Sequence, residues 1–368
     1  MKILQSCGSS SWGGLEMFTL RTSCELKESG HDITILCRKN STLSEKAIEK
    51  GLPILPLYGS GFFAPALICR IARKISTGGF EVIHTHLSHD LWTLVPAIKF
   101  SHVKPKLFFT KHMGSGVSKR DIFHRFLYRN VDGIFAISNY VKESVLRSCP
   151  VKSDVIRVLH PGISLEKYGK ELFNKAAVRK KFNISDDSIV VGMAGRMTPG
   201  KGHEEFLSAV NYLKDLIKGN ITYLVIGNAS YGEENYENKI RRLAGELNIN
   251  DILHFTGFIN NIPEMMAALD IFVFPSHEES FGFMLLEAMA SQLPVIACRS
   301  AGVPDIVIDK VTGILVPPGD YKALAEAIKQ LAENQDSRYE LGKAGRKRVE
   351  KYFGINDIIS QLLKYYRE

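Results

Sequence analysis

The feature that most constrains the fold of this 368-residue chain is a regular alternation between short apolar runs and helix-length segments. Runs typical of buried strands cover residues 2–4, 32–36, 81–84, 107–110 and 133–136. Longer segments with helical periodicity lie between these runs, as at 15–29 and 91–100. The alternation predicts an α/β fold, in which helices cover a parallel sheet.

The alternation is interrupted once. Residues 160–174, HPGISLEKYGKELFN, contain Pro and Gly and have no periodicity; strand-like runs then resume at 189–194, 221–226, 252–255, 270–274 and 294–297. A chain of this length is too long for one ordinary hydrophobic core. We therefore predict two doubly wound halves joined near residue 165, with ligands where strand ends meet helix N-termini and the active site in a cleft between the halves.

Positive charge is concentrated in the N-terminal half of the chain. Residues 1–170 contain 24 Lys and Arg against 13 Asp and Glu, whereas residues 171–368 contain 23 against 26. Between residues 99 and 129 the only acid is Asp121, and the basic residues are Lys99, Lys104, Lys106, Lys111, Lys119, Arg120, Arg125 and Arg129. Such a patch is typical either of an anionic partner or of a solvated basic face. No nucleic-acid-binding module accompanies it.

A second basic segment covers residues 61–75, GFFAPALICRIARKI, where apolar residues alternate with Arg70, Arg73 and Lys74. This pattern is typical of a helix that lies on a membrane surface, and also of an ordinary helix that faces the core. No run approaches the roughly 20 apolar residues that span a bilayer. We therefore expect a cytoplasmic protein that can bind the inner leaflet of the plasma membrane as a peripheral protein.

Two glycine-containing loops are candidates for phosphate binding. In SSSWGGLEMF, residues 9–18, the glycine pair directly precedes a helical segment, where it either presents free amides to a phosphate or forms a tight turn. In GRMTPGKG, residues 195–202, Lys201 and two glycines reproduce most of the signature G-x-x-x-x-G-K-[ST]. Gly202 replaces the Ser or Thr whose hydroxyl would hold Mg²⁺. With Arg196 as a second cation, the loop predicts a diphosphate site rather than a triphosphatase.

A third loop is the most specific. In FPSHEESFGFMLLEAMASQLPVIA, residues 274–297, Glu279 follows an apolar strand and Glu287 lies inside the next helix. Free amides at the start of that helix can bind an anion, and the two carboxylates can accept hydrogen bonds from sugar or ribose hydroxyls. The alternative is that Glu279 caps the helix and Glu287 forms an internal ion pair. Because a Glu on an apolar face is costly without a partner, we favour the functional interpretation.

These motifs, in this order, resemble those of the GT4-type retaining glycosyltransferases with the GT-B fold. The resemblance covers nearly the whole chain and includes VLHPGIS at 158–164 and GVPDIVIDKVTGILVPPGD at 302–320. It implies an N-terminal Rossmann-like domain, residues 1–168, that binds the acceptor, with a helix at about 352–368 packing back on it. It also implies a C-terminal Rossmann-like domain, residues 169–351, that binds a nucleotide-sugar donor.

The resemblance further implies roles for single residues. Arg196 and Lys201 would bind the donor diphosphate and stabilise the departing nucleotide. Glu287 would bind the ribose hydroxyls, and Glu279 would face the transferred sugar. The other donor contacts would be made at Gly13, Gly14, Gly195, Gly227, Gly257, Ser280, Phe281, Gly282 and Phe283.

A histidine of the N-terminal domain is expected to hydrogen-bond the donor sugar near the reacting carbon. His112 in FFTKHMG matches that position, with His84 and His86 in VIHTHL as competitors. One departure from the family pattern concerns Gln292, where a glycine usually follows the helix with the two glutamates. It removes a favoured left-handed cap and is expected to shift the helix end slightly.

The implied activity is transfer of a hexosyl group from a UDP- or GDP-type donor to a glycan or lipid-linked acceptor, in lipopolysaccharide or other cell-surface polysaccharide synthesis. The sequence contains no D-x-D, so fixed cations would neutralise the leaving diphosphate without a metal or other cofactor. The acceptor or the membrane would face Lys104, Lys106, Lys119, Arg120, Arg125, Arg70, Arg73 and Lys74. The alternatives are a nucleotide-sugar 2-epimerase of the same fold and a non-catalytic nucleotide-sugar-binding protein.

Overall fold

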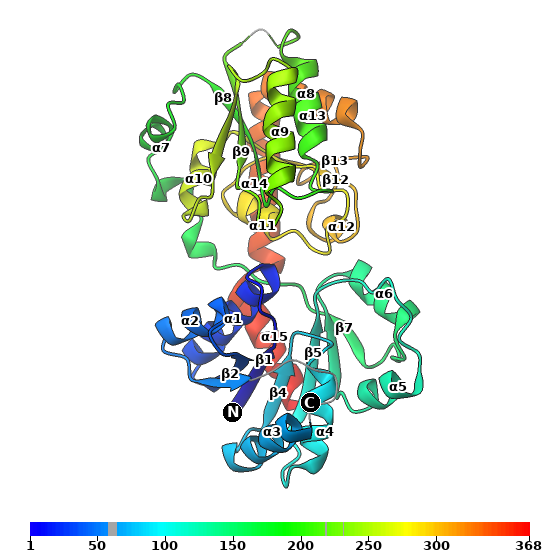
Figure 1. Cartoon of the computed structure of the whole chain (residues 1–368). Coiled ribbons are helices and arrows are strands. Elements are labelled where there is room, and N and C mark those ends of the chain that lie inside the picture. The colour runs from blue at the N-terminus through cyan, green and yellow to red at the C-terminus, as the bar shows by residue number, and fades with distance from the viewer. Residues whose placement is uncertain (58–64, 218, 231) are drawn as a thin grey trace. The chain divides into compact units, whose positions relative to one another are not determined.

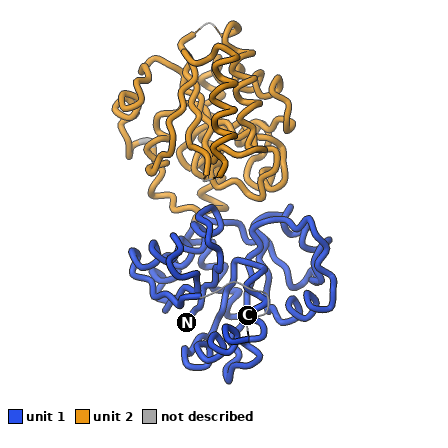
Figure 2. The backbone as a smooth tube through the Cα atoms, viewed as in Figure 1, with its two compact units in different colours: residues 1–162, 355–368 blue, residues 163–354 orange. Residues whose placement is uncertain are grey.

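The structure is a computed structural model that describes residues 1–57, 65–217, 219–230 and 232–368 (Figure 1). The chain divides into two compact units, which are coloured separately in Figure 2. Unit 1 comprises Met1–Gly162 and Ile355–Glu368, and unit 2 comprises Ile163–Gly354. The two crossings of the chain between the units therefore lie at Gly162 and Gly354.

Unit 1 contains a seven-stranded parallel sheet in the order β3-β2-β1-β4-β5-β6-β7. Its strands are β1 (Lys2–Cys7), β2 (Asp32–Arg38), β3 (Ile54–Leu57), β4 (Val82–Thr85), β5 (Lys106–Lys111), β6 (Gly133–Ala136) and β7 (Ile156–Val158). Its helices include α1 (Gly14–Glu28), α2 (Thr42–Glu49), α3 (Pro65–Gly78), α4 (Leu91–Phe100), α5 (Ile122–Tyr128), α6 (Asn139–Ser148) and α15 (Ile355–Arg367). The strand order reverses between β1 and β4, and ligands of doubly wound sheets bind at such switch points.

Unit 2 contains a six-stranded parallel sheet in the order β10-β9-β8-β11-β12-β13, which reverses between β8 and β11. Its strands are β8 (Ile189–Ala194), β9 (Ile221–Ile226), β10 (Leu253–Gly257), β11 (Ile271–Phe274), β12 (Val295–Cys298) and β13 (Ile314–Val316). Its helices include α7 (Lys175–Lys181), α8 (His203–Leu213), α9 (Glu234–Glu246), α10 (Ile262–Ala268), α11 (Phe283–Ala290), α12 (Val303–Ile306), α13 (Tyr321–Glu333) and α14 (Gln335–Tyr352). Short 3₁₀ turns cover Leu165–Lys167 and Lys170–Leu172.

The predicted fold class, two doubly wound parallel sheets, is confirmed. Three strands were not predicted, β3, β7 and β13, and each occupies an outer position in its sheet. Edge strands bury less surface than central ones and so need a weaker apolar pattern; β3 even contains Pro56, which an edge strand tolerates. The central strands were found because a parallel sheet covered on both faces requires continuous apolar runs.

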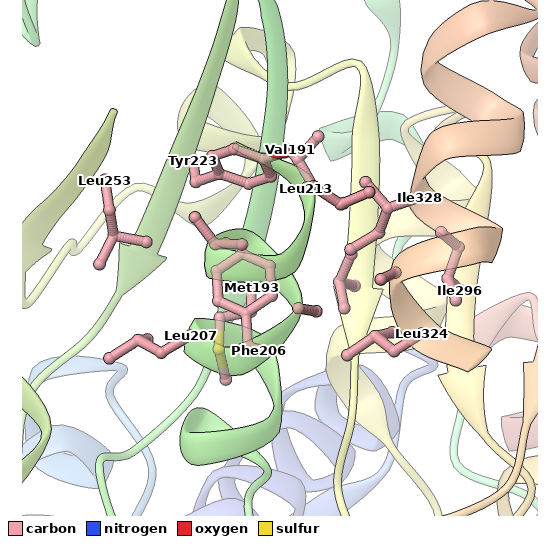
Figure 3. Close-up of a cluster of buried hydrophobic side chains, with 14 of the residues drawn as sticks. Val191, Met193, Phe206, Leu207, Leu213, Tyr223, Leu253, Ile296, Leu324 and Ile328 are labelled. Carbon is pink, nitrogen blue, oxygen red and sulfur yellow. The ribbon is translucent and has the colours of Figure 1, made fainter. Parts of the chain in front are cut away.

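The core of unit 2 lies where α8 and α13 cover one face of the sheet (Figure 3). Val191 and Met193 of β8 point into it because alternate residues of a strand share one face. The other side chains labelled in Figure 3 are Phe206, Leu207, Leu213, Tyr223, Leu253, Ile296, Leu324 and Ile328. This packing fixes the carboxyl ends of β8 and β11, from which two of the candidate loops start.

The C-terminal helix α15 belongs to the core of unit 1. Its apolar stripe is formed by Ile355, Ile358, Ile359, Leu362 and Tyr366, spaced as one face of a helix, and it packs in the same cluster as side chains of β1 and β2. The last turns of the chain are thereby placed beside residues from its beginning.

Candidate active site

The two most specific sequence motifs follow neighbouring strands in unit 2. GRMTPGKG follows β8, and the loop with Glu279 follows β11; these strands pair with each other at the switch point of the sheet. The loops are joined directly, since the His277 amide donates a hydrogen bond to the Gly200 carbonyl at 2.9 Å. The fold therefore brings together two motifs that are far apart in the sequence, where a ligand of this sheet type binds.

A charged pair crosses these two loops. Lys201 Nζ lies 2.7 Å from Glu279 Oε2, and the two side chains are 28% and 20% exposed. Because both charges keep contact with water, the pair stabilises the fold by less than about 1 kcal/mol. Arg196, in the same loop, is exposed, and its guanidinium has no hydrogen-bond or ion-pair partner among the described residues. Both cations are thus available to an anionic ligand at small cost.

Glycines let the backbone of the strand ends approach closely. Gly195, Gly227 and Gly257 all have positive φ, of 156°, 122° and 70°. The Gly227 amide donates to the Gly257 carbonyl at 2.9 Å, and a Cβ on Gly227 would lie 2.1 Å from the Gly195 carbonyl oxygen. The three predicted donor-contact glycines therefore lie close together at the ends of β8, β9 and β10, where they carry no side chain that would cover the main chain.

The start of α11 has the turn that the sequence predicts. Gly282, with a φ of 103°, is its N-cap residue, in a left-handed conformation that glycine adopts without strain. The loop before it is fixed because the Gly302 amide donates to the Glu279 carbonyl at 2.8 Å, and Phe281 is buried. Glu287 is buried within α11. Ser280 and Phe283 flank the turn and are half-buried.

The expected shift at the end of α11 does not occur. Gln292 itself adopts the left-handed conformation, with a φ of 57°. Its amide donates to the Met289 carbonyl and the Leu293 amide donates to the Ala288 carbonyl, both at 3.0 Å, which is the pattern of a Schellman cap. The cap forms without glycine because its two hydrogen bonds satisfy the last carbonyls of the helix, and Gln292 bears the conformational cost.

In unit 1 the three candidate histidines belong to one buried hydrogen-bonded chain. His112 Nε2 lies 3.2 Å from His86 Nδ1, and His86 Nε2 lies 2.8 Å from Gln5 Oε1. His84 bonds Tyr366 Oη through Nδ1 at 2.5 Å and Thr110 Oγ1 through Nε2 at 2.7 Å. Gln5 Nε2, 3.5 Å from Tyr366 Oη, joins the two branches. Sequence reasoning missed Gln5, Thr110 and Tyr366, because no local pattern marks them.

These histidines are uncharged at neutral pH. Burial, followed by the charge of a neighbouring group, lowers the pKa of His84 and of His112 to about 3 and holds the pKa of His86 well below its usual range. The side chain of Lys111 is also buried, and burial lowers its pKa to about 8, with nearby Lys119 as a second cause. The site in unit 1 therefore offers neutral imidazoles, in contrast to the cations of unit 2.

Gly13 and Gly14 stand at the start of α1, directly after the loop that follows β1. Gly13 is the N-cap residue, and its amide donates to Glu16 Oε2 at 2.8 Å. Its φ of −160° suits any residue, and a Cβ on Gly14 would meet no described atom within 4 Å. Neither the backbone nor the packing of the described residues requires glycine here, which is consistent with a requirement imposed by a ligand.

A pocket at the carboxyl ends of β1, β2 and β4 was not foreseen from the sequence. Its polar lining includes Arg38, His89 and Asp90, and its apolar lining includes Leu36 and Leu94. The Asp90 carboxylate accepts hydrogen bonds from Ser6 Oγ at 2.8 Å and from the Gly8 amide at 3.0 Å. Burial raises the pKa of Asp90 above its usual value. The pocket thus presents a guanidinium and a carboxyl group at the switch point of unit 1.

Several residues of the predicted basic patch have structural contacts. Lys104 Nζ donates to three carbonyls at the end of α4, Lys106 Nζ to carbonyls at the end of α15, and Arg120 to carbonyls at the end of α6. Cations at these positions complement helix dipoles. Lys119 Nζ lies 3.4 Å from Ser88 Oγ, and Arg125 Nε donates to the Arg120 carbonyl at 2.9 Å.

The predicted amphipathic segment at 61–75 is a helix over its described part. Residues 61–64 lie outside the described residues, and α3 buries Ile68, Ile71, Ala72 and Ile75 while Arg70, Arg73 and Lys74 are exposed. Exposed apolar side chains occur instead in α5 and in the loop before it, and we call these residues the α5 surface: Met113, Val117, Ile122, Phe123 and Phe126. Ile122 is 76% exposed. Among the described helices none is long and apolar enough to span a bilayer.

Comparison with protein families assigns the chain. A model described as Glycosyltransferase Family 4 matches residues 12–167, and one described as Glycosyl transferases group 1 matches residues 174–348. Together the two models cover most of both units. The chain belongs to the GT4-type glycosyltransferases, whose two halves these models describe, and its fold is GT-B.

Individual relatives agree with this assignment. A D-inositol 3-phosphate glycosyltransferase from Saccharomonospora viridis is 26% identical, over 99% of this chain and 91% of the relative. The capsular polysaccharide biosynthesis glycosyltransferase CapM from Staphylococcus aureus is 33% identical over 63% of this chain and 60% of its own length. The crystal structure of a glycosyltransferase from Rickettsia africae superposes with a TM-score of 0.90 at 22% identity, covering 100% of this chain and 97% of that one.

A further solved structure shares the fold. Anabaena HepE, crystallised with UDP and glucose, has a TM-score of 0.85 at 19% identity, with 99% of this chain and 98% of that chain covered. The resemblance predicted from the motifs is thereby confirmed at the level of family and fold. The roles of the individual site residues stay predictions.

Proposed function

We propose that this protein transfers a sugar from a nucleotide-diphosphate sugar to a hydroxyl of a glycan or glycolipid acceptor, with retention of configuration and without a metal. The observation that carries the proposal is the joining of the two motif loops at the switch point of unit 2, with Lys201 held 2.7 Å from Glu279. The chain belongs to a family of glycosyltransferases. Its candidate site combines the cations Lys201 and Arg196 with closely packed glycine main chain, and such a site suits a diphosphate leaving group. HepE, of the same fold, was crystallised with UDP-glucose.

Lys201 and Arg196 supply the charge that the reaction needs. When the bond between the sugar and the diphosphate breaks, negative charge develops on the departing phosphate oxygen. Fixed cations beside that oxygen stabilise the transition state more than the ground state. Glu279 holds Lys201 in the free protein, and we propose that it accepts a hydrogen bond from the transferred sugar in the complex. Glu287 would bind the ribose hydroxyls.

The bonds exchange on one face of the sugar. The acceptor oxygen forms its bond to the anomeric carbon as the bond to the diphosphate breaks. The acceptor proton moves to the departing phosphate oxygen, so no protein base is required. Loss of a nucleoside diphosphate and formation of a glycoside with unchanged anomeric configuration balance the reaction. Gly13, Gly14 and the glycines at the ends of β8, β9 and β10 would let the main chain approach the donor.

The activity is tested with Lys201→Ala and with Lys239→Ala as its matched control. Lys239 also forms an ion pair in unit 2, 3.1 Å from Glu204, outside the candidate site. We expect Lys201→Ala to lower kcat by about 10²–10³-fold, as for removal of one group that stabilises developing charge, with little change in melting temperature. Lys239→Ala is expected to leave kcat unchanged.

The assay also separates the alternatives. Purified protein is incubated with a panel of UDP- and GDP-sugars, with and without a glycan acceptor, and the products are identified by NMR. A new nucleotide sugar formed without acceptor would identify an epimerase, and nucleotide binding without turnover would identify a binding protein. Wild-type activity in Lys201→Ala, or an inverted anomeric product, would contradict the proposed mechanism.

For the acceptor we propose a lipid-linked or lipopolysaccharide-type glycan at the inner leaflet. The α5 surface combines exposed apolar side chains with Arg120, Arg125 and Arg129, a composition that favours the interface of an anionic membrane. The pocket with Arg38 and Asp90 is then a candidate for acceptor hydroxyls. The relative CapM is named for capsular polysaccharide biosynthesis.

Vesicle co-sedimentation tests this part separately. We expect binding to vesicles with anionic lipid at low salt, less binding at high salt, and little binding to zwitterionic vesicles. Phe123→Gln should weaken binding, whereas Phe258→Gln, at a 69% exposed position in unit 2, should not. Equal binding to both kinds of vesicle, or to neither, would contradict the membrane proposal and leave the transferase proposal standing.

A further inference from the structure

The hydrogen-bonded chain in unit 1 has a direction, and Gln5 sets it. Its Oε1 lies 2.8 Å from His86 Nε2. Since a carbonyl oxygen only accepts, the proton must be on His86 Nε2. In a neutral imidazole the other nitrogen is then an acceptor, so His86 Nδ1 accepts a hydrogen bond from His112 Nε2, 3.2 Å away. His112 Nδ1 is left with a lone pair.

The second branch runs in the direction that matches this orientation of the Gln5 amide. Gln5 Nε2 donates to Tyr366 Oη at 3.5 Å, Tyr366 donates to His84 Nδ1 at 2.5 Å, and His84 Nε2 donates to Thr110 Oγ1 at 2.7 Å. Turning the Gln5 amide over would reverse each bond and leave His112 with its proton on Nδ1. Without Tyr366, Gln5 Nε2 would lose its hydrogen-bond acceptor, so this end of the amide would no longer be held.

We propose that Gln5 and Tyr366 are positioning residues that fix His112 in the tautomer with the proton on Nε2, so that Nδ1 can accept a hydrogen bond from a hydroxyl of the transferred sugar. His112 keeps 8% of its surface exposed, and its Nδ1 has no hydrogen-bond partner among the described residues. The assignment of a sugar hydroxyl as the ligand of Nδ1 rests on the proposed function, whereas the assignment of the tautomer does not.

This arrangement has a chemical consequence. A lone pair at His112 Nδ1 favours a hydroxyl, which can donate, and disfavours a carboxylate, which can only accept. The reversed tautomer, with its proton on Nδ1, would donate to either group, because hydroxyl and carboxylate oxygens both accept. The C-terminal helix, through Tyr366, therefore influences which group of the sugar this position accepts, although Tyr366 touches neither His112 nor His86 by hydrogen bonding. Phe18 packs edge-on against both rings and limits their rotation.

The experiment measures the tautomer directly, by ¹⁵N NMR of the histidine side chains in the full-length protein without substrate. In wild type we expect one signal set for His112, with Nε2 protonated and Nδ1 bare; a His112→Gln variant assigns it. In Tyr366→Phe, which keeps the ring but removes the hydroxyl, we expect a second tautomer. The matched control is Tyr365→Phe in the same helix, whose hydroxyl makes no hydrogen bond with the described residues.

Kinetics give the second readout. We expect Tyr366→Phe to lower kcat about tenfold, with the Kd for the nucleoside diphosphate unchanged, and Tyr365→Phe to alter neither. A His112 protonated on Nδ1 in wild type would overturn the proposal even if Tyr366→Phe does not fold. So would a Tyr366→Phe variant with wild-type tautomer and kcat. Because the NMR measurement needs no substrate, it decides the tautomer even if the wild-type protein transfers no sugar.

Discussion

The two units share the strand order around their switch points but place different chemistry there. Unit 1 presents neutral imidazoles that are buried and hydrogen-bonded to one another, and unit 2 presents Lys201 and Glu279, which stay in contact with water. Buried polar groups are tolerated when each finds a partner, whereas a buried charge costs several kcal/mol. The degree of burial of the polar side chains therefore decides what each site can do. Unit 1 offers fixed, uncharged hydrogen-bonding groups, and unit 2 offers cations that can exchange partners.

The largest expected difference between the units is their response to acid. An unfolded histidine binds a proton below about pH 6.5, but pKa values of about 3 keep folded His84 and His112 neutral down to about pH 3, and burial also holds the pKa of His86 well below its usual range. The unfolded state therefore binds more protons, and stability is lost as pH falls from 6.5 toward 3. From His84 and His112 alone we expect the free energy of unfolding of unit 1 to drop by roughly 2–3 kcal/mol between about pH 7 and about pH 5.5, and His86 adds to this drop.

In unit 2 the described histidine with a lowered pKa is His203, whose burial lowers its pKa to about 4. Hydrogen exchange of amides in β4 and β5 against those in β8 and β9, corrected for intrinsic rates, compares the two units. His112→Gln should reduce the pH dependence in unit 1 alone. Equal pH dependence in the two units would break the comparison.

The next effect tests how the glycines of unit 2 shape its loop. Gly200 and Gly202 have nearly equal φ, 83° and 81°, but a Cβ would meet no described atom within 4 Å at Gly200 and would lie 2.2 Å from the Pro275 carbonyl oxygen at Gly202. We expect Gly202→Ala to destabilise by about 3 kcal/mol and Gly200→Ala by about 1 kcal/mol. Urea unfolding measures both losses of stability, and the difference between them gives the cost of the clash with the Pro275 carbonyl oxygen. Equal losses would mean that the loop moves away freely.

A smaller effect separates stability from activity in unit 1. Gly14→Ala should keep or raise stability, by up to about 1 kcal/mol, because alanine favours a helix and no described atom stands in its way. If the donor approaches this loop, kcat/KM should nevertheless fall about tenfold. Gly219→Ala, also at an open glycine but outside the candidate site, serves as the control. Unchanged kcat/KM in Gly14→Ala would remove Gly14 from the proposed donor contacts.

The smallest effect concerns the end of α11. Replacing Gln292 by glycine removes the cost of a left-handed conformation, with a φ of 57°, while keeping the two hydrogen bonds of the cap. We expect the free energy of unfolding to rise by about 1 kcal/mol. Urea denaturation would detect the change as a shift of the midpoint, with the same dependence of the unfolding free energy on urea concentration in both proteins. A loss of stability would show that the Gln292 side chain contributes more than its backbone costs.

The sequence alone determined the fold class and the family. Apolar runs of strand length between helical segments specify a parallel sheet because both faces of that sheet must be buried. The loops with Lys201 and Glu279 were found from their residue types, since cations, glycines and carboxylates at fixed spacing are local patterns. The edge strands β3, β7 and β13 were missed because partial burial leaves little trace in the sequence.

Only the tertiary structure decided which residues act together. Lys201 meets Glu279 because β8 pairs with β11, and strand order in a parallel sheet depends on crossover connections that no local pattern encodes. Likewise, Gln5 and Tyr366 stand at opposite ends of the chain and meet because α15 packs into the core of unit 1. The sequence identified His112 as a candidate, but its tautomer depends on partners that only the packing of distant segments brings within hydrogen-bonding distance.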